Sequence, residues 1–142
     1  PNSINTVPGS VELSLDIRDL SPDVIAHMIE HLRRKIETIA VASRTRIRMR
    51  PELEVEPTPA STTIQELIVE SCKDMDLTYT HLPSRASHDA QEMGRFTDMG
   101  MIFVPSKEGI SHSGEEYTSP EQCTQGANIL LRTLLKLDRL YR

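Results

Sequence analysis

The sequence is that of an acidic protein of 142 residues, with 37% hydrophobic and 26% charged residues and a formal net charge of −5. This length accommodates one ordinary domain or two small ones. The negative charge, with no basic run along a whole face, argues against nucleic acid as a partner. No apolar run approaches the roughly 20 residues that a membrane-spanning helix needs. We therefore expect neither a nucleic-acid nor a membrane partner.

Cys72 and Cys123 are the only cysteines in the sequence, and each has apolar neighbours at helical spacing. We interpret both as small buried hydrophobic residues in a reducing compartment, which predicts a cytoplasmic location. The sequence begins at Pro1 without a methionine, and its first residues lead directly into a predicted strand. We therefore expect it to be part of a longer protein.

The first part of the chain is predicted to form two strands joined by a helix. Apolar and polar residues alternate over Val11–Ile17 and again over residues 46–54, as they do in half-buried strands. Between them, Ser21 and Pro22 are suited to cap and begin a helix of about five turns. This pattern predicts a small open sheet with a helix on one face, too thin to bury a good core by itself.

Prolines at positions 51, 57 and 59 interrupt the periodicity and mark a domain boundary. We predict a first domain over residues 1–54 and a second over residues 55–142. The predicted fold class is α/β, with an α+β first half, an α/β second part and open sheets packed with helices. The elements predicted in the second part are a helix over residues 61–75, an extended stretch over 77–82, a short helix over 87–96, a buried strand over 101–104, and a last helix that Ser119, Pro120 and Gln122 cap and begin.

Two loops are more polar than a purely structural loop needs to be. Residues 84–89 stand at the start of a predicted helix, and residues 107–113 follow the predicted buried strand. In α/β folds such places often bind ligands, and His88 and His112 could each bind a metal ion. A zinc site needs three or more protein ligands, so these histidines do not make a complete site. His27 and His31, four residues apart on the first helix, are interpreted as solvated surface residues.

Five motifs occur in order along the sequence. They are Pro1–Asn5 with Val7–Gly9, Asp16–Asp19, Ser84–Ala90, Gly100–Pro105, and Gly109–Ser113 with Glu116 and Tyr117. With these motifs the sequence resembles the C-terminal part of the N-carbamoyl-L-amino-acid hydrolases, allantoate amidohydrolases and ureidoglycolate amidohydrolases, within the aminoacylase and carboxypeptidase superfamily of metallohydrolases. The resemblance covers essentially the whole chain.

The resemblance implies a division of labour between the two predicted domains. Residues 1–54 would be the second half of a lid and dimerisation domain, and residues 55–142 the C-terminal part of a catalytic domain. Hydrolysis of a ureido or amide C–N bond by metal-activated water is implied, with two divalent ions, zinc or manganese. The general base and the other metal ligands are expected upstream, so no catalytic residue is expected in this chain and the isolated chain is expected to be inactive.

The same resemblance assigns individual residues to the substrate and to the metal. The implied substrate-binding residues are Asn5 and Arg18, which would hold the substrate carboxylate from the lid, and Ser84, Arg85, Ala86 and His88. The implied metal ligand is His112. A guanidinium suits a carboxylate because it can make a bidentate, charge-assisted pair with it. The expected partners are a small ureido-acid substrate and a second copy of the chain, bound through the lid.

One motif departs from the pattern of most of these enzymes. They carry Ser-Gly-Ala-Gly-His-Asp where this sequence has Ser-Arg-Ala-Ser-His-Asp at residues 84–89. The Ser-Arg-Ala form is similar to the ureidoglycolate amidohydrolases, which favours a substrate related to ureidoglycolate over an N-carbamoyl amino acid. The alternative is a non-catalytic dimerisation or interaction module descended from such an enzyme.

Overall fold

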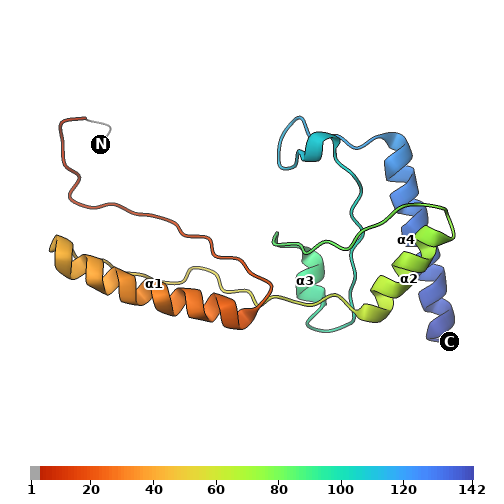
Figure 1. Cartoon of the computed structure of the whole chain (residues 1–142), viewed down its shortest axis with the longest axis horizontal. Helices are drawn as coiled ribbons and strands as arrows, with labels where there is room; N and C mark the ends of the chain where they lie inside the picture. The colour runs from red at the N-terminus through yellow and green to blue at the C-terminus, as the bar shows by residue number, and fades with distance from the viewer. Residues whose placement is uncertain (1–3) are drawn as a thin grey trace. The chain divides into compact units, whose positions relative to one another are not determined.

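The computed structural model describes residues 4–142, so the first three residues of the Pro1–Asn5 motif lie outside the described residues. The chain divides into two units, Pro1–Val55 and Glu56–Arg142. No helix in residues 4–142 is long and apolar enough to cross a membrane. Each unit is built around helices, whose order along the chain is shown in Figure 1.

The first unit contains one long helix, α1 (Pro22–Ser43), which confirms the helix predicted after Ser21. The Ser21 side chain accepts a hydrogen bond from the Val24 N–H, and Pro22 occupies the first turn, where its missing N–H costs nothing. The helix ends where Arg44 turns into the left-handed region with φ 52°, and its N–H bonds back to the carbonyls of Ala40 and Val41. His27 and His31 are exposed on this helix, as predicted.

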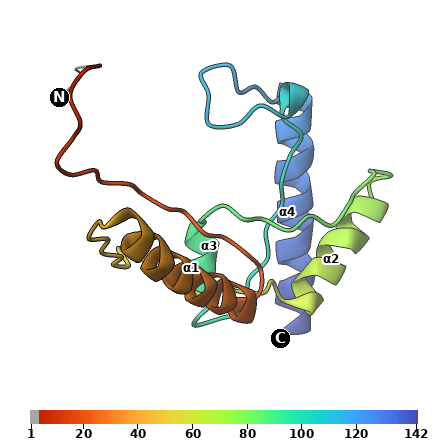
Figure 2. The ribbon, with the colours of Figure 1, turned by 60° about the vertical axis from the view of Figure 1, so that its left-hand side comes forward.

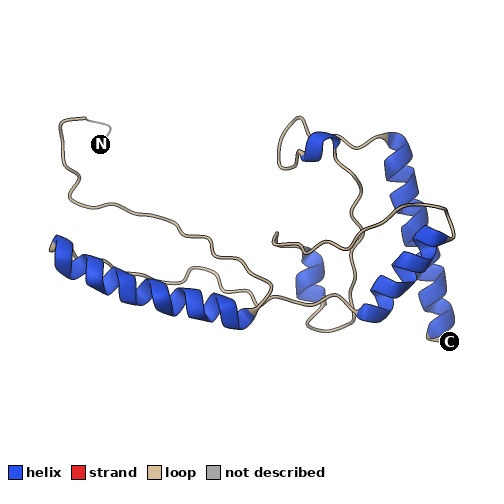
Figure 3. Ribbon diagram, in the orientation of Figure 1, coloured by secondary structure: helices blue, strands red, loops and turns tan. Residues whose placement is uncertain are grey.

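The α/β prediction, with open sheets packed with helices, is wrong for the described residues. Residues 4–142 contain no strand, and the segments before and after α1 are irregular (Figure 3). Alternating residues suit a pleated surface, but a strand exists only where a neighbouring strand completes its ladder of hydrogen bonds. The two segments are linked by an ion pair between Arg50 and Glu12 at 3.8 Å, not by a ladder. Apolar residues such as Leu13, 87% exposed, therefore stay in water.

The second unit contains four helical elements, and three of them match predicted helices. The capping box predicted at the last helix is confirmed: Ser119 Oγ accepts from the Gln122 N–H at 3.2 Å, and Gln122 Oε1 accepts from the Ser119 N–H at 3.3 Å. The elements are α2 (Thr62–Lys73), α3 (Asp89–Met93), the short 3₁₀ helix η1 (Lys107–Gly109) and α4 (Pro120–Leu140).

Packing between α2 and α4 forms the core of the second unit, as Figures 1 and 2 both show. Ser71 on α2 is completely buried and Thr133 on α4 is nearly so. Among residues 4–142, the buried apolar residues are Cys72, Met99 and Ile129. At one end of the contact, Lys136 lies 3.2 Å from Glu70 and 2.9 Å from Asp74. The core is small for 87 residues (residues 56–142).

The run Met101–Val104 is neither a strand nor fully buried, contrary to prediction. Phe103 is 53% exposed and Val104 is 39% exposed. The run lies against the helices on one side: Gly126 on α4 is buried, and a side chain there would collide with Val104. A run of apolar residues is buried on both faces only when a second layer covers the other face.

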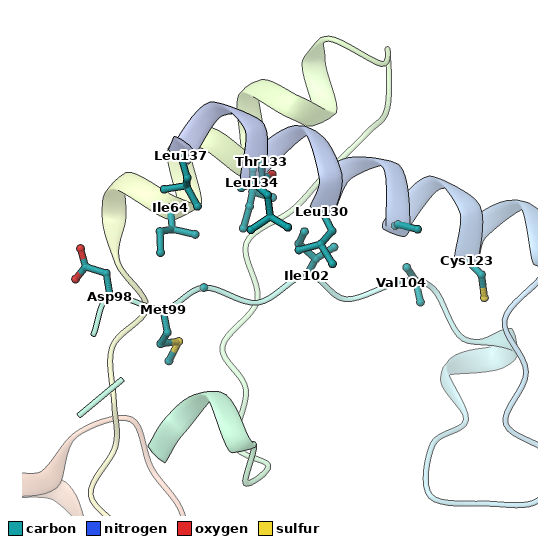
Figure 4. Close-up of a pocket in the computed structure, with 14 residues that line it drawn as sticks. Ile64, Asp98, Met99, Ile102, Val104, Cys123, Leu130, Thr133, Leu134 and Leu137 are labelled. Atoms are coloured by element: carbon teal, nitrogen blue, oxygen red, sulfur yellow. The ribbon is translucent and has the colours of Figure 1, made fainter. Parts of the chain in front are cut away.

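An open apolar groove of about 610 Å³ remains beside this run, between α2 and α4 (Figure 4). Cys123 lines the groove and is exposed, so the prediction that both cysteines are buried holds for Cys72 and is wrong for Cys123. The residues labelled in Figure 4 are Ile64, Asp98, Met99, Ile102, Val104, Cys123, Leu130, Thr133, Leu134 and Leu137.

Candidate functional site

The loop before α3 brings two of the predicted substrate-binding side chains into contact. Ser84 Oγ and His88 Nε2 lie 2.7 Å apart, which is hydrogen-bond distance. The Ala86 N–H donates to the same Ser84 oxygen at 3.3 Å, so the loop turns back around this hydroxyl. Ser84 and His88 are half-buried, whereas Arg85 and Ala86 are exposed. The loop therefore places the imidazole firmly and leaves the arginine at the surface.

His88 also contacts the apolar run that follows α3. Its ring meets the ring of Phe103 edge to face, with centroids 5.6 Å apart and planes at 67°. His88 is the N-cap residue of α3, in an extended conformation. The ring is thus held by a hydrogen bond from its own loop and by an aromatic contact from residues farther along the chain.

The second polar loop, residues 107–113, is part of a longer loop over residues 105–118. Two hydrogen bonds close the base of this longer loop. The Lys107 N–H donates to the Tyr117 carbonyl at 2.8 Å, and the Thr118 hydroxyl donates to the Pro105 carbonyl at 2.9 Å. Closed loops of this kind are compact and often functional. The tip of the loop contains His112.

His112 adopts a left-handed backbone conformation, with φ 57°. Residues other than glycine adopt it rarely, and histidine tolerates it better than most. The His112 N–H donates to Glu116 Oε2 at 2.9 Å, which holds the turn. Glu108 and Gly109 in the same loop also have positive φ, 56° and 70°. Two of the four non-glycine residues with positive φ in residues 4–142 thus lie in this loop, and the other two are Arg44 and Asp76. Such backbone positions are often found at functional sites.

The described residues do not by themselves fit a metal centre. Within residues 4–142, no group of three or more His, Cys, Asp or Glu side chains could hold a metal ion. A structural or catalytic zinc needs three or four protein ligands. The exposed His112 can therefore supply at most part of a site, and His88 is engaged with Ser84.

In the first unit, Arg18 is held by an acidic neighbour that the sequence analysis did not single out. Arg18 Nε donates to Asp16 Oδ1 at 2.8 Å, and Arg18 Nη2 donates to Asp16 Oδ2 at 2.7 Å. The hydrogen bond from Arg18 lowers the pKa of Asp16, and the hydrogen bond to Asp16 raises the pKa of Arg18. Both groups therefore stay charged, and the fork of the guanidinium has a fixed orientation.

The seven predicted site residues fall into three local groups. Asn5 and Arg18 belong to the first unit, residues 84–88 form the Ser84–His88 loop, and His112 stands on its own loop. Phe103, Asp16 and Glu116 contact these residues. All three lie within the motifs quoted above, but the sequence analysis assigned no role to any of them.

Comparison with known proteins matches almost the entire chain. The sequence model of Peptidase family M20/M25/M40 matches residues 6–136. An N-carbamoyl-L-amino acid amidohydrolase of Geobacillus stearothermophilus is 34% identical over 137 residues, which are 96% of this chain and 34% of the relative. A ureidoglycolate hydrolase of Arabidopsis thaliana is 32% identical over 139 residues, 97% of this chain and 29% of the relative.

A solved structure agrees with the sequence matches. The crystal structure of AtUAH in complex with glyoxylate has a TM-score of 0.74 with this chain, at 30% identity, over 84% of this chain and 28% of that one. The chain spans about a third of the length of the curated relatives it matches. The resemblance to this group of amidohydrolases is confirmed, and the chain belongs to Peptidase family M20/M25/M40.

Proposed function

We propose that this chain is part of a metal-dependent amidohydrolase that hydrolyses the C–N bond of a ureido acid. The observation that carries the proposal is the match, over almost the whole chain, to proteins named for ureido substrates. The ureido acid proposed first is ureidoglycolate or a close relative, with N-carbamoyl-L-amino acids second. The Ser-Arg-Ala sequence at residues 84–86 and the likeness to AtUAH in complex with glyoxylate support that order.

In this proposal Arg18 and Asn5 bind the carboxylate of the substrate. A guanidinium has five N–H donors on a rigid fork, and Asp16 engages the Nε and Nη2 side of Arg18. A guanidinium is suited to a carboxylate because it can make a bidentate, charge-assisted pair with it. Asp16 thus orients the fork, and the exposed Asn5 amide adds a neutral donor.

The loop of residues 84–88 is proposed to bind the ureido end of the substrate. Ser84 and His88 present polar atoms in a fixed arrangement, and the Ala86 N–H lies within that arrangement. Arg85 stands where most relatives of this group have glycine, so it adds a cation beside the substrate. A cation favours a substrate with a second anionic or strongly dipolar group.

His112 is proposed as one ligand of one of two divalent ions, zinc or manganese. The remaining ligands and the general base are proposed to come from residues outside the 142-residue sequence. The loop closed by the Lys107–Tyr117 and Thr118–Pro105 hydrogen bonds supports a fixed position for this imidazole. With at most one metal ligand and no general base, the isolated chain is expected to bind zinc weakly and to be inactive.

Residues 1–54 are proposed as the second half of a lid that also forms a homodimer, and residues 55–142 as part of the catalytic domain. The division of the chain at Val55 supports this boundary. No residue of α1 is buried, and its Val24, Met28 and Ile39 are exposed, which supports a partner surface over this helix. The free thiols of Cys72 and Cys123 are consistent with the proposed cytoplasmic location.

The test is ammonium release by the protein expressed from its complete reading frame, referred to below as the complete protein. After loading with manganese, it is assayed with ureidoglycolate, allantoate and several N-carbamoyl-L-amino acids. A clear preference for one ureido acid is the expected result. No release from any of them, with metal bound, would overturn the proposal and favour the non-catalytic dimerisation or interaction module.

A second experiment tests His112 without relying on activity. Metal content of the complete protein is measured by mass spectrometry for the wild type, for His112→Ala and for the control His81→Ala. His81 is an exposed histidine outside both polar loops. Loss of bound metal in His112→Ala alone is expected, whereas equal metal content in all three proteins would exclude His112 as a ligand.

A further inference from the structure

We infer that Ser84 is a positioning residue that holds His88 in the tautomer with its proton on Nδ1, so that His88 donates from Nδ1 to the ureido carbonyl oxygen of the substrate. The inference rests on the proposed function for the identity of that ligand. The tautomer itself follows from the contacts of the loop. In a neutral imidazole, the hydrogen bond at one nitrogen determines what the other nitrogen can do.

The direction of the Ser84–His88 hydrogen bond follows from the other contact of Ser84. A serine hydroxyl has one hydrogen to donate and two lone pairs to accept with. The Ala86 N–H already points at Ser84 Oγ at 3.3 Å. If the hydroxyl donates to His88 Nε2, at 2.7 Å, it accepts one hydrogen bond and donates another.

The reverse direction, in which His88 Nε2–H donates to Ser84 Oγ, satisfies fewer of the same donors and acceptors. His88 Nε2–H and the Ala86 N–H would then both donate to one half-buried oxygen, and the hydroxyl hydrogen of Ser84 would need a third partner. Polar groups removed from water are most stable when each donor and acceptor is used. The first direction makes Nε2 the acceptor, so the proton of the neutral ring resides on Nδ1.

Phe103 and Ser84 together fix the orientation of the ring. The edge-to-face contact, with centroids 5.6 Å apart, fixes the plane of the imidazole, while the Ser84 hydrogen bond fixes which edge faces the loop. A flip of the ring would exchange Nε2 and its neighbouring carbon and would break the hydrogen bond. The Nδ1–H donor therefore keeps one direction, as a preorganised binding group requires.

The chemistry of a ureido acid assigns the oxygen that receives this hydrogen bond. Such a substrate offers a carboxylate and a neutral ureido carbonyl as its carbonyl-type acceptors, and ureidoglycolate adds a hydroxyl. The carboxylate suits the charged Arg18, because paired charges make the stronger hydrogen bonds. A neutral N–H donor such as His88 Nδ1–H suits the neutral carbonyl.

The experiment reads the tautomer directly. The complete protein is labelled with ¹⁵N-histidine, and the ring nitrogens of His88 are assigned by comparison with His88→Gln. The variants are Ser84→Ala, which removes the hydroxyl, and Ser84→Thr, which retains it. Ser87→Ala, a serine of the same loop, is the matched control for the His88 resonances. The resonances of the other histidines report whether each variant is folded.

The expected wild-type spectrum shows a proton on Nδ1 and an acceptor at Nε2. Ser84→Ala should shift His88 to a mixture of tautomers and lower kcat/KM about tenfold, with part of the loss in kcat, because the carbonyl oxygen gains negative charge in the transition state. Ser84→Thr should restore both properties, and Ser87→Ala should leave the His88 resonances unchanged. A purely structural role for Ser84 predicts no change in the tautomer.

Two results would overturn the inference, and the first needs only the wild-type protein. It is a wild-type His88 that carries its proton on Nε2. The other is a His88 tautomer that is the same in Ser84→Ala as in the wild type. An Nδ1–H tautomer that depends on Ser84, in a protein that hydrolyses no ureido acid, would support the positioning by Ser84 and overturn the proposed function alone.

Discussion

The hydroxyl of Thr133 on α4 lies 3.3 Å from the hydroxyl of Ser71 on α2, although the two residues are 62 positions apart in the sequence. Each hydroxyl also bonds to a carbonyl of its own helix: Thr133 to Ile129 at 2.8 Å and Ser71 to Leu67 at 2.8 Å. Ser71 has no exposed surface. The contact between α2 and α4 thus depends on small polar residues that satisfy their own hydrogen bonds and let the helices approach closely.

This packing predicts that a change of side-chain size at the α2–α4 contact lowers the stability of the fold more than the loss of a hydroxyl does. Thr133→Val keeps the shape, and Ser71 can still donate to its own helix, so the loss of stability should be within about 1 kcal/mol. Ser71→Leu forces a large side chain into a closed contact and should cost about 2 kcal/mol or more. Urea unfolding of the complete protein measures both. Equal costs for the two variants would show that the helices do not pack at these residues.

The Lys136 ion pairs predict how the stability of the α2–α4 contact changes with pH. The hydrogen bond from Lys136 lowers the pKa of Asp74, and the hydrogen bond to Asp74 raises the pKa of Lys136. A carboxyl with a lowered pKa stabilises the fold above its unfolded pKa, about 3.9, and loses this effect as pH falls through the folded value. A lysine with a raised pKa stabilises it below about 10.4 and loses the effect as pH rises through the folded value.

The contribution of this pair should therefore be fully present between about pH 4 and pH 10 and decline at both ends. Lys136→Met should reduce the stability in that range and flatten the decline at the acidic end. Lys35→Met, at an exposed position on α1, is the control and should keep the wild-type pH dependence. Thermal unfolding measured across pH checks this, and an unchanged acidic limb in Lys136→Met would contradict it.

The two cysteines should differ in reactivity in the 142-residue chain. Cys72 is buried on α2, and its burial raises the pKa of the thiol, so little reactive thiolate forms. Cys123 is exposed on α4 beside the apolar groove. Brief alkylation at pH 8, followed by peptide mass spectrometry, should label Cys123 at least about ten times faster. Equal labelling would mean that Cys72 is not buried in solution.

Helices could be predicted from the sequence because their signals are local. Ser21 followed by Pro22, and Ser119 followed by Gln122, cap α1 and α4 as expected. A strand has no comparable local signal, because it makes its hydrogen bonds with neighbouring strands. Residues 11–17 alternate between apolar and polar side chains and still form no strand. The burial of Cys123 was wrongly predicted for a related reason: apolar neighbours along a helix do not say whether another element covers that face.

The sequence allowed the residues of the candidate site to be predicted, but not the contacts that support them. The family motifs pointed to His88, Arg18 and His112, but their supporting partners depend on backbone geometry. Glu116 reaches the His112 N–H through a left-handed turn that no pattern in the sequence announces. Asp16 binds Arg18 across an irregular segment that was predicted to be a strand. Side chains two residues apart share a face in a strand, so the predicted strand also allowed the Asp16–Arg18 pair but did not require it.

Arg85 is predicted to govern the choice of substrate. Arg85→Gly removes a cation and gives this position the backbone freedom of glycine. Relative rates on ureidoglycolate, allantoate and N-carbamoyl amino acids should change by about tenfold, with metal content unchanged. Arg85→Lys, which keeps the charge, is the matched control. Unchanged relative rates in Arg85→Gly would remove Arg85 from the substrate-binding residues.

The most direct test of the central claim is ammonium release from ureidoglycolate by the complete protein before and after its metal is removed. We predict release by the manganese-loaded protein, loss of release after chelation and dialysis, and recovery when manganese or zinc is added back. The same cycle with His112→Ala should show little recovery. Release that persists after chelation, or no release from a metal-loaded wild type, would contradict the assignment of this chain to a metal-dependent ureido-acid amidohydrolase.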